Sequence, residues 1–153
     1  MPRTLRLFAV AAMLMFAASA AGAAEGLIVK TIPHSVGVTL DRLEAAIKKA
    51  GARVFARIDH GKGAASIGQD LRPTQLLIFG NPKMGTPLLQ SAQPIGLDLP
   101  LRVVAWEDAA GKVHIAYNDP AHLAKRYGIT DRDKVFAKMS GALGKLTGAA
   151  IKP

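Results

Sequence analysis

The first two dozen residues differ sharply in composition from the rest of the chain. Arg3 and Arg6 precede an uncharged apolar run over 7–16 (LFAVAAMLMF), and small residues then continue to Ala24. A basic start, an apolar centre and a small-residue end are typical of a secretory signal peptide. The small side chains before position 24 predict cleavage at or near the Ala23–Ala24 bond. Residues 1–23 then lie outside the fold, and 24–153 form one domain with its core over about 27–147.

An uncleaved membrane anchor is the alternative interpretation of this segment. Residues 7–24 hold 18 positions without a charge, close to the roughly 20 apolar residues that a membrane-spanning helix needs. The second half is Ala, Gly and Ser, which contribute little to membrane insertion, and a lipid anchor would need a cysteine that the sequence lacks. We therefore expect a periplasmic or secreted protein with no stable membrane anchor after cleavage.

The net charge and the missing cysteines exclude several classes of function. Loss of Arg3 and Arg6 with the signal peptide lowers the formal net charge from +9 to +7. Export, dispersed charges and the lack of a nucleic-acid-reading motif argue against nucleic acid as a partner, whereas an anionic membrane surface, a cell-wall polymer or an acidic protein stays open. Without cysteine there is no disulfide, thiol catalysis or thiolate metal site, so packing alone must hold the domain.

Hydrophobic periodicity in the remaining chain predicts consecutive strands followed by a final helix. Strands are expected over 26–32, 53–59, 75–79, 101–107 and 112–117. Helices are expected over 39–50, in a short stretch through Leu88 and Leu89, over 122–127 and from Thr130 onwards. The segment 60–68 is either a loop or a loop with one helical turn, and 91–98 is a loop. This order indicates an α+β fold with a largely antiparallel sheet and helices packed on one face.

Capping residues refine these helix boundaries. Thr39 is the expected N-cap of the first helix, and Gly51 is expected to end it. Thr86 is the expected cap of the second, with Pro87 at its first position. The glycines at 141, 144 and 148 each lower helix stability by up to about 1 kcal/mol relative to alanine, so we expect the last turns of the final helix to fray.

No sequence motif for nucleophilic catalysis or nucleotide binding is present, and the identity of any cofactor is left open by the sequence. The four histidines, His34, His60, His114 and His122, lack the local spacing of a metal site. His60 is the candidate worth testing as a metal ligand, because it joins a strand end to a glycine-rich segment. Polar groups at strand ends make His60, Asn81, Lys83 and Tyr117 the ligand-binding candidates, although packing beside Trp106 also explains Tyr117.

The stretches IDHGKGA, LLIFGNPKMGTPLL, PIGLDLPLRVVAWED and VHIAYNDPAHLAKRYG closely resemble a family known as domain of unknown function 302. The resemblance covers the chain from Leu27 to its C-terminus. It implies a TATA-binding-protein-like β-α-β4-α fold and homodimers, and it brings no established activity, cofactor or catalytic residue. The family's marker residues fall on Asp59, His60, Asn81, Pro82, Gly85, Leu99, Pro100, Tyr117 and Pro120.

Two hypotheses of different classes follow. The leading one is a non-enzymatic periplasmic module that binds a small ligand or a partner protein near His60, Asn81 and Lys83. The alternative is a metal- or haem-assisted redox accessory protein that uses His60 with His34, His114 or His122. A hydrolytic enzyme is the least favoured hypothesis.

Overall fold

The sheet has two faces of different character, and only one is covered by long helices. In the computed structural model, which describes residues 24–152, five strands form one antiparallel sheet in the order β1-β5-β4-β3-β2. The expected signal peptide and its cleavage site lie outside the described residues. The strands are β1 (Leu27–Ile32), β2 (Arg53–Asp59), β3 (Thr74–Gly80), β4 (Leu101–Glu107) and β5 (Val113–Asn118). The predicted α+β fold with an antiparallel sheet is confirmed.

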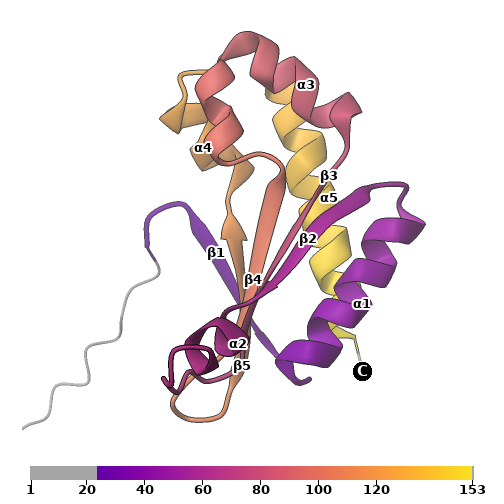
Figure 1. Ribbon diagram of the computed structural model, residues 1–153. Helices are drawn as coiled ribbons and strands as arrows, with labels where there is room; N and C mark the ends of the chain where they lie inside the picture. Colours follow the sequence, from indigo (N-terminus) through magenta and orange to yellow (C-terminus); the bar gives the residue numbers. More distant parts are fainter. Residues whose placement is uncertain (1–23, 153) are drawn as a thin grey trace, which may run out of the picture.

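Two long helices, α1 (Val36–Lys49) and α5 (Asp133–Ile151), lie side by side on one face of the sheet (Figure 1). Short helices occupy its two ends. Figure 1 shows α2 (His60–Ala65) at one end, with α3 (Pro82–Ser91) and α4 (Pro120–Arg126) at the other. A 3₁₀ turn, η1 (Gln93–Leu97), follows α3. The β-α-β4-α order implied by the resemblance is present, with the short helices inserted between strands.

The core lies between the two long helices and the sheet. Leu40, Leu43 and Ile47 follow one stripe of α1 and are fully buried, as the helical spacing predicts. Leu77 and Ile115 meet them from the sheet and are equally buried. Each such side chain contributes about 1.5–3 kcal/mol relative to an exposed one. This packing holds together a domain that has no disulfide.

The opposite face of the sheet is more accessible. Val29 on β1 and Ile58 on β2 point to this face and are 39% and 41% exposed. The edge strand β2 carries a β-bulge between Val54 and Ala56, where its register against β3 shifts. The homodimer implied by the family resemblance stays a prediction.

The first helix begins one turn earlier than its expected cap. Ser35, rather than Thr39, caps α1, and its hydroxyl accepts a hydrogen bond from the Val38 backbone N–H at 3.4 Å. The Thr39 hydroxyl is buried and donates to the Ser35 carbonyl at 2.8 Å. Ser35 is an equally good capping residue, and it comes first after Pro33 has ended β1. Gly51 stops the helix as predicted, with a φ of 73°.

Three other helices also differ from the predicted boundaries. Asn81 caps α3 and Pro82 takes its first position, so Thr86 and Pro87 lie inside the helix and the expected cap was wrong. Asp119 caps α4 at Pro120, ahead of the expected start at His122. Both cases are an Asx-Pro pair, in which the side chain caps while proline needs no N–H partner. The final helix starts at Asp133, not Thr130, and stays helical through its glycines to Ile151.

Candidate functional site

A cavity of about 360 Å³ lies at the end of the sheet where β2 begins and β3 ends. Residues of α3, α5, the start of β2 and the segment Leu99–Leu101 line it, and we call it the α3–α5 cavity. Its volume falls within the range of about 300–1,000 Å³ that small-molecule sites occupy. The fold therefore leaves a space of ligand size between elements that are far apart in the sequence.

The wall of the cavity is almost entirely apolar. Met84 and Leu89 reach it from α3, Met139 and Leu146 from α5, and Phe79 from β3. Met139 and Phe79 are only 1% and 2% exposed, so the inner end of the cavity belongs to the hydrophobic core. Methionine side chains are flexible and polarizable, which lets such a wall adapt to ligands of different shape.

The mouth of the cavity is formed by those lining residues that are exposed. These are Ala50, Phe55, Pro82, Thr86 and Pro100. Asn81 and Thr86 are the polar side chains among the described lining residues. The Asn81 amide oxygen accepts from the Lys83 backbone N–H at 2.9 Å and is thus already used in capping α3. The cavity offers apolar contact and few hydrogen bonds.

Gly85 leaves open space at the cavity wall. A Cβ atom built on Gly85 would meet no atom within 4 Å, and the residue is in the interior of α3. Glycine inside a helix costs about 1 kcal/mol relative to alanine. Protein packing supplies no reason for this cost, because the space beside Gly85 is free. Gly80 is different: a Cβ there would lie 3.3 Å from Cβ of Pro100, a tight contact that would require a small shift of its neighbour.

The segment that completes the wall is fastened by a buried carboxylate. Asp98 is 7% exposed. Its Oδ1 accepts from Arg102 Nη2 at 2.8 Å and from Asn118 Nδ2 at 3.1 Å, and its Oδ2 accepts from the Tyr127 hydroxyl at 2.5 Å. Arg126 Nη1 lies 3.5 Å from Oδ2. Asp98 thereby ties the stretch before Leu99 to β4, β5 and the end of α4.

The same hydrogen bond perturbs the tyrosine. Donation to the Asp98 carboxylate raises the pKa of Tyr127 above its ordinary value of 10.0, and burial acts in the same direction. The hydroxyl therefore stays protonated, as a donor to Asp98 must. The Asp98 cluster is fully paired among the described residues and has a structural role beside the cavity.

The structure separates the residues that the sequence predicts as one site. Asn81 lines the α3–α5 cavity, and Lys83 follows the mouth residue Pro82 in the first turn of α3. His60 lies at the other end of the sheet, because Asp59 pairs with Gln75 at the start of β3 whereas Gly80 pairs with the start of β2. The prediction of a common site for His60, Asn81 and Lys83 is wrong in this respect.

Tyr117, the fourth candidate, is 6% exposed and belongs to the hydrophobic core. Lys30 lies on the same face of the neighbouring strand, with its Nζ 5.6 Å from the Tyr117 ring centroid and 2.7 Å from Thr147 Oγ1. The packing interpretation of Tyr117 therefore fits its place in the fold. Its ring is not exposed at the α3–α5 cavity, which it does not line.

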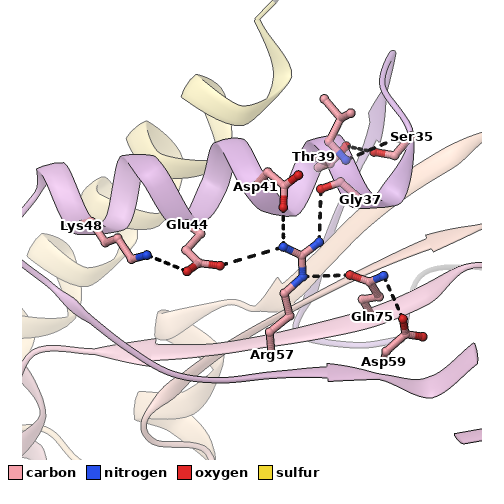
Figure 2. Close-up of polar contacts among 10 residues, drawn as sticks. Ser35, Gly37, Thr39, Asp41, Glu44, Lys48, Arg57, Asp59 and Gln75 are labelled. Carbon is pink, nitrogen blue, oxygen red and sulfur yellow. Dashed lines mark hydrogen bonds and ion pairs between the residues drawn. The ribbon is translucent and has the colours of Figure 1, made fainter. Parts of the chain in front are cut away.

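A polar network explains Asp59 without a ligand (Figure 2). Asp59 accepts from the Lys62 backbone N–H at 3.0 Å, which caps α2, and from Gln75 Nε2 at 3.2 Å. Gln75 in turn accepts from Arg57 Nε at 2.9 Å, and Arg57 Nη1 reaches Asp41 on α1 at 2.5 Å. Exposed pairs of this kind contribute about 0–1 kcal/mol. The network fastens the edge strand to α1.

The histidines do not converge on one point. His60 is exposed at the start of α2, and His122 packs against Gly26. His34 lies 2.9 Å from the Lys152 carbonyl oxygen, beside a more open hollow at the far end of the sheet from the α3–α5 cavity. Within residues 24–152 no cluster of three or more His, Asp or Glu side chains has the geometry to hold a metal ion.

His114 has local partners on the more accessible face of the sheet. Its Nε2 lies 2.7 Å from Asp108 Oδ2, and its ring packs against Trp106 with 5.3 Å between centroids and a tilt of 30°. The hydrogen bond from His114 lowers the pKa of Asp108 below its ordinary value, and the Lys112 backbone N–H adds to this effect. His114 thus stabilises the turn between β4 and β5.

Comparison with known proteins assigns the family. The sequence model of "Domain of unknown function DUF302" matches residues 28–146. The chain belongs to the DUF302 family. A crystal structure of an uncharacterized conserved DUF302 protein from Bacillus stearothermophilus is similar with a TM-score of 0.74, covering 83% of this chain and 99% of that chain at 20% sequence identity. That likeness shows the DUF302 fold alone.

Curated relatives of this DUF302 chain include proteins named as fluoride-specific ion channels. FluC 1 of Brucella suis biovar 1 (strain 1330) is 51% identical over 104 residues, which is 68% of this chain and 41% of that protein. FluC 1 of Brucella abortus biovar 1 (strain 9-941) has the same identity over 38% of its length. This chain therefore spans about two fifths of the relatives it matches, and the likeness concerns that part.

The cavity wall is what the sequence interpretation missed. Met139 and Leu146 fit the apolar stripe of the final helix, because an apolar residue beside a cavity has the same pattern as one in contact with another side chain. Gly85 could have pointed to the cavity from the sequence. It follows the helix start at Asn81-Pro82 by only a few residues, where a glycine neither begins nor ends a helix. Asp98 was assigned to a loop, and its buried partners are distant in the sequence.

Proposed function

We propose that this DUF302 chain is an exported, non-enzymatic module that binds a small apolar ligand in the α3–α5 cavity. The cavity itself is the observation that supports this function: about 360 Å³ of space, an apolar wall and an open mouth. Of the predicted residues, Asn81 lines the cavity, and Lys83 follows Pro82 of its mouth along the chain. The proposal thus keeps ligand binding as the function and places the site at the α3–α5 cavity, away from His60.

The chemistry of the wall favours binding over catalysis. Catalysis of a proton or acyl transfer needs a nucleophile or a base aimed at the reacting atom. The described lining residues supply only Asn81, which caps a helix, and the Thr86 hydroxyl. An apolar wall with few polar groups instead suits recognition by shape and burial of apolar surface.

Export is the second part of the proposal, and it is supported by the sequence of residues 1–24. Among residues 24–152 no helix combines the length and apolarity needed to cross a bilayer. Mass spectrometry of the protein from its host would test export by the mass of the N-terminal peptide. A peptide that begins near Ala24 is expected, and an intact N-terminus in the cytoplasmic fraction would contradict export.

Binding of a neutral apolar fluorophore, N-phenyl-1-naphthylamine, tests the cavity. Its fluorescence rises when it enters an apolar environment, so titration into the mature chain should give a saturable increase. Ala142→Phe places a ring in the cavity and should lower the affinity at least tenfold. Ala137→Phe is the matched control, because Ala137 is on the exposed side of the same helix.

Thermal unfolding of both variants would confirm that they are folded before their affinities are compared. No saturable signal with the unsubstituted chain would refute an apolar ligand site. Equal affinities of the Ala142→Phe and Ala137→Phe variants would place the fluorophore outside the α3–α5 cavity.

A further inference from the structure

The mouth of the α3–α5 cavity carries positive charge. Lys83 follows Pro82 at the mouth and is exposed. The Arg53 guanidinium carbon lies 5.3 Å from the ring centroid of Phe55, which also lines the mouth. Lys49 precedes Ala50, another exposed lining residue. Three basic residues therefore neighbour the mouth: Arg53 through its contact with Phe55, and Lys49 and Lys83 through the adjacent mouth residues Ala50 and Pro82.

These mouth cations lack acidic partners among the described residues. Two other basic side chains on α1 and β2 do have such partners: Lys48 lies 2.8 Å from Glu44, and Arg57 lies 2.5 Å from Asp41. No ion pair within residues 24–152 involves Lys49, Arg53 or Lys83. Their charge is available to a ligand.

The chain segments that build the cavity contain no acid. All lining residues fall in the segments 45–58, 71–97, 99–106 and 134–152, and none of these includes Asp or Glu. The nearest acid along the chain, Asp98, is buried and has Arg102 and Arg126 as partners, so it presents no net negative charge to the cavity. Asp131 accepts from Ser91 at the last residue of α3, away from the mouth.

We infer that the ligand is a single-chain amphiphile with an anionic head, such as a carboxylate with an aliphatic tail. The tail fills the apolar cavity, and the head stays at the mouth beside Arg53 and Lys83. This inference rests on the proposed function, because it names the class of ligand for the same cavity. An aliphatic tail matches a wall with almost no hydrogen-bonding groups, and an anion matches a mouth flanked by unpaired cations.

The size of the charge effect is set by solvent. Opposite charges attract each other more strongly near a protein surface than in bulk water, so two mouth cations should favour an anionic head by about tenfold at low ionic strength. Salt screens exposed charges over about 10 Å at 0.1 M, so the preference should shrink as salt is added.

Competition against bound N-phenyl-1-naphthylamine separates the head from the tail. Decanoate, decanol and decyltrimethylammonium share a tail length and differ in head charge, and each is used below its micelle concentration. Decanoate should displace the fluorophore about tenfold more effectively than decanol, and the cationic amphiphile should be weaker than decanol. Equal displacement by all three would refute the anionic head and leave the apolar cavity intact.

Failure of every amphiphile and of the fluorophore itself would instead refute the proposed function. The double variant Arg53→Gln with Lys83→Gln should lower decanoate affinity about tenfold and leave decanol affinity unchanged. Lys62→Gln with Lys112→Gln is the matched control, because both lysines are exposed near the other end of the sheet and the net charge changes equally. An equal loss in the control would show a general charge effect and overturn the inference.

Discussion

Asp98→Ala removes the carboxylate that fastens the segment before Leu99 to the neighbouring elements. The native carboxylate accepts hydrogen bonds from Arg102, Asn118 and Tyr127 and lies near Arg126. Alanine at this position removes the carboxylate acceptor from each of these donors, and Arg102 keeps its bond to the Leu97 carbonyl. The substitution should therefore destabilise the whole domain and loosen one wall of the α3–α5 cavity.

The expected magnitude follows from how exposed each partner is. Asn118 and Tyr127 are half-buried and partly reached by water, so each lost bond costs the lower end of the usual range, about 1 kcal/mol. The Arg102 and Arg126 side chains are 40% and 55% exposed, and exposed ion pairs contribute about 0.2–1 kcal/mol each. Asp98→Ala should thus lower the free energy of unfolding by about 2–4 kcal/mol.

Urea unfolding followed by the fluorescence of Trp106, the single tryptophan, measures this change. An unchanged m-value would show that the denatured state is comparable in the two proteins. Asp70→Ala is the control, because Asp70 is an exposed loop residue, and its effect should stay within about 0.5 kcal/mol. A loss below about 1 kcal/mol for Asp98→Ala would refute the assigned role of the buried carboxylate.

Two further predictions concern Gly85 and Asp108. Gly85→Ala should raise the free energy of unfolding by about 0.5–1 kcal/mol and weaken fluorophore binding. Gly141→Ala in α5 is the control and should raise the free energy of unfolding without changing binding. Equal binding by the two variants would contradict a ligand beside Gly85. Because His114 lowers the pKa of Asp108 from its ordinary 3.8, the ionised carboxylate stabilises the native state above about pH 3.8, and this contribution is lost as pH falls through the lower native pKa. Asp108→Asn should therefore flatten the loss of stability in acid, and an acid titration identical to that of the parent chain would disprove this linkage.

Most strand positions follow from the sequence because each strand carries its own local signal. The segment Arg53–Asp59 alternates apolar and polar side chains except at Phe55, and its bounds were predicted to the last residue. The start of α3 was harder, because Asn81-Pro82 and Thr86-Pro87 both fit a cap followed by proline. The helix starts at Asn81-Pro82 rather than at Thr86-Pro87, because the earlier start gives a longer helix in which more backbone N–H and C=O groups form hydrogen bonds.

The candidate site was only partly predictable, for two physical reasons. Antiparallel pairing places the end of β2 beside the start of β3, so His60 and Asn81 had to lie at opposite ends of that strand pair. This consequence was available from the expected antiparallel sheet. The cavity was not, because its wall combines residues such as Phe55, Leu99 and Met139 from separate segments, and its empty volume depends on how closely α3 approaches α5.

The β-bulge between Val54 and Ala56 has a consequence for how the protein behaves at high concentration. β2 forms one edge of the sheet, where unpaired backbone groups could recruit a strand from another molecule. The bulge interrupts the regular spacing of those groups, and Arg53 and Arg57 add charge on either side of it. The bulge beside Phe55 thus also makes this edge a poor template for aggregation.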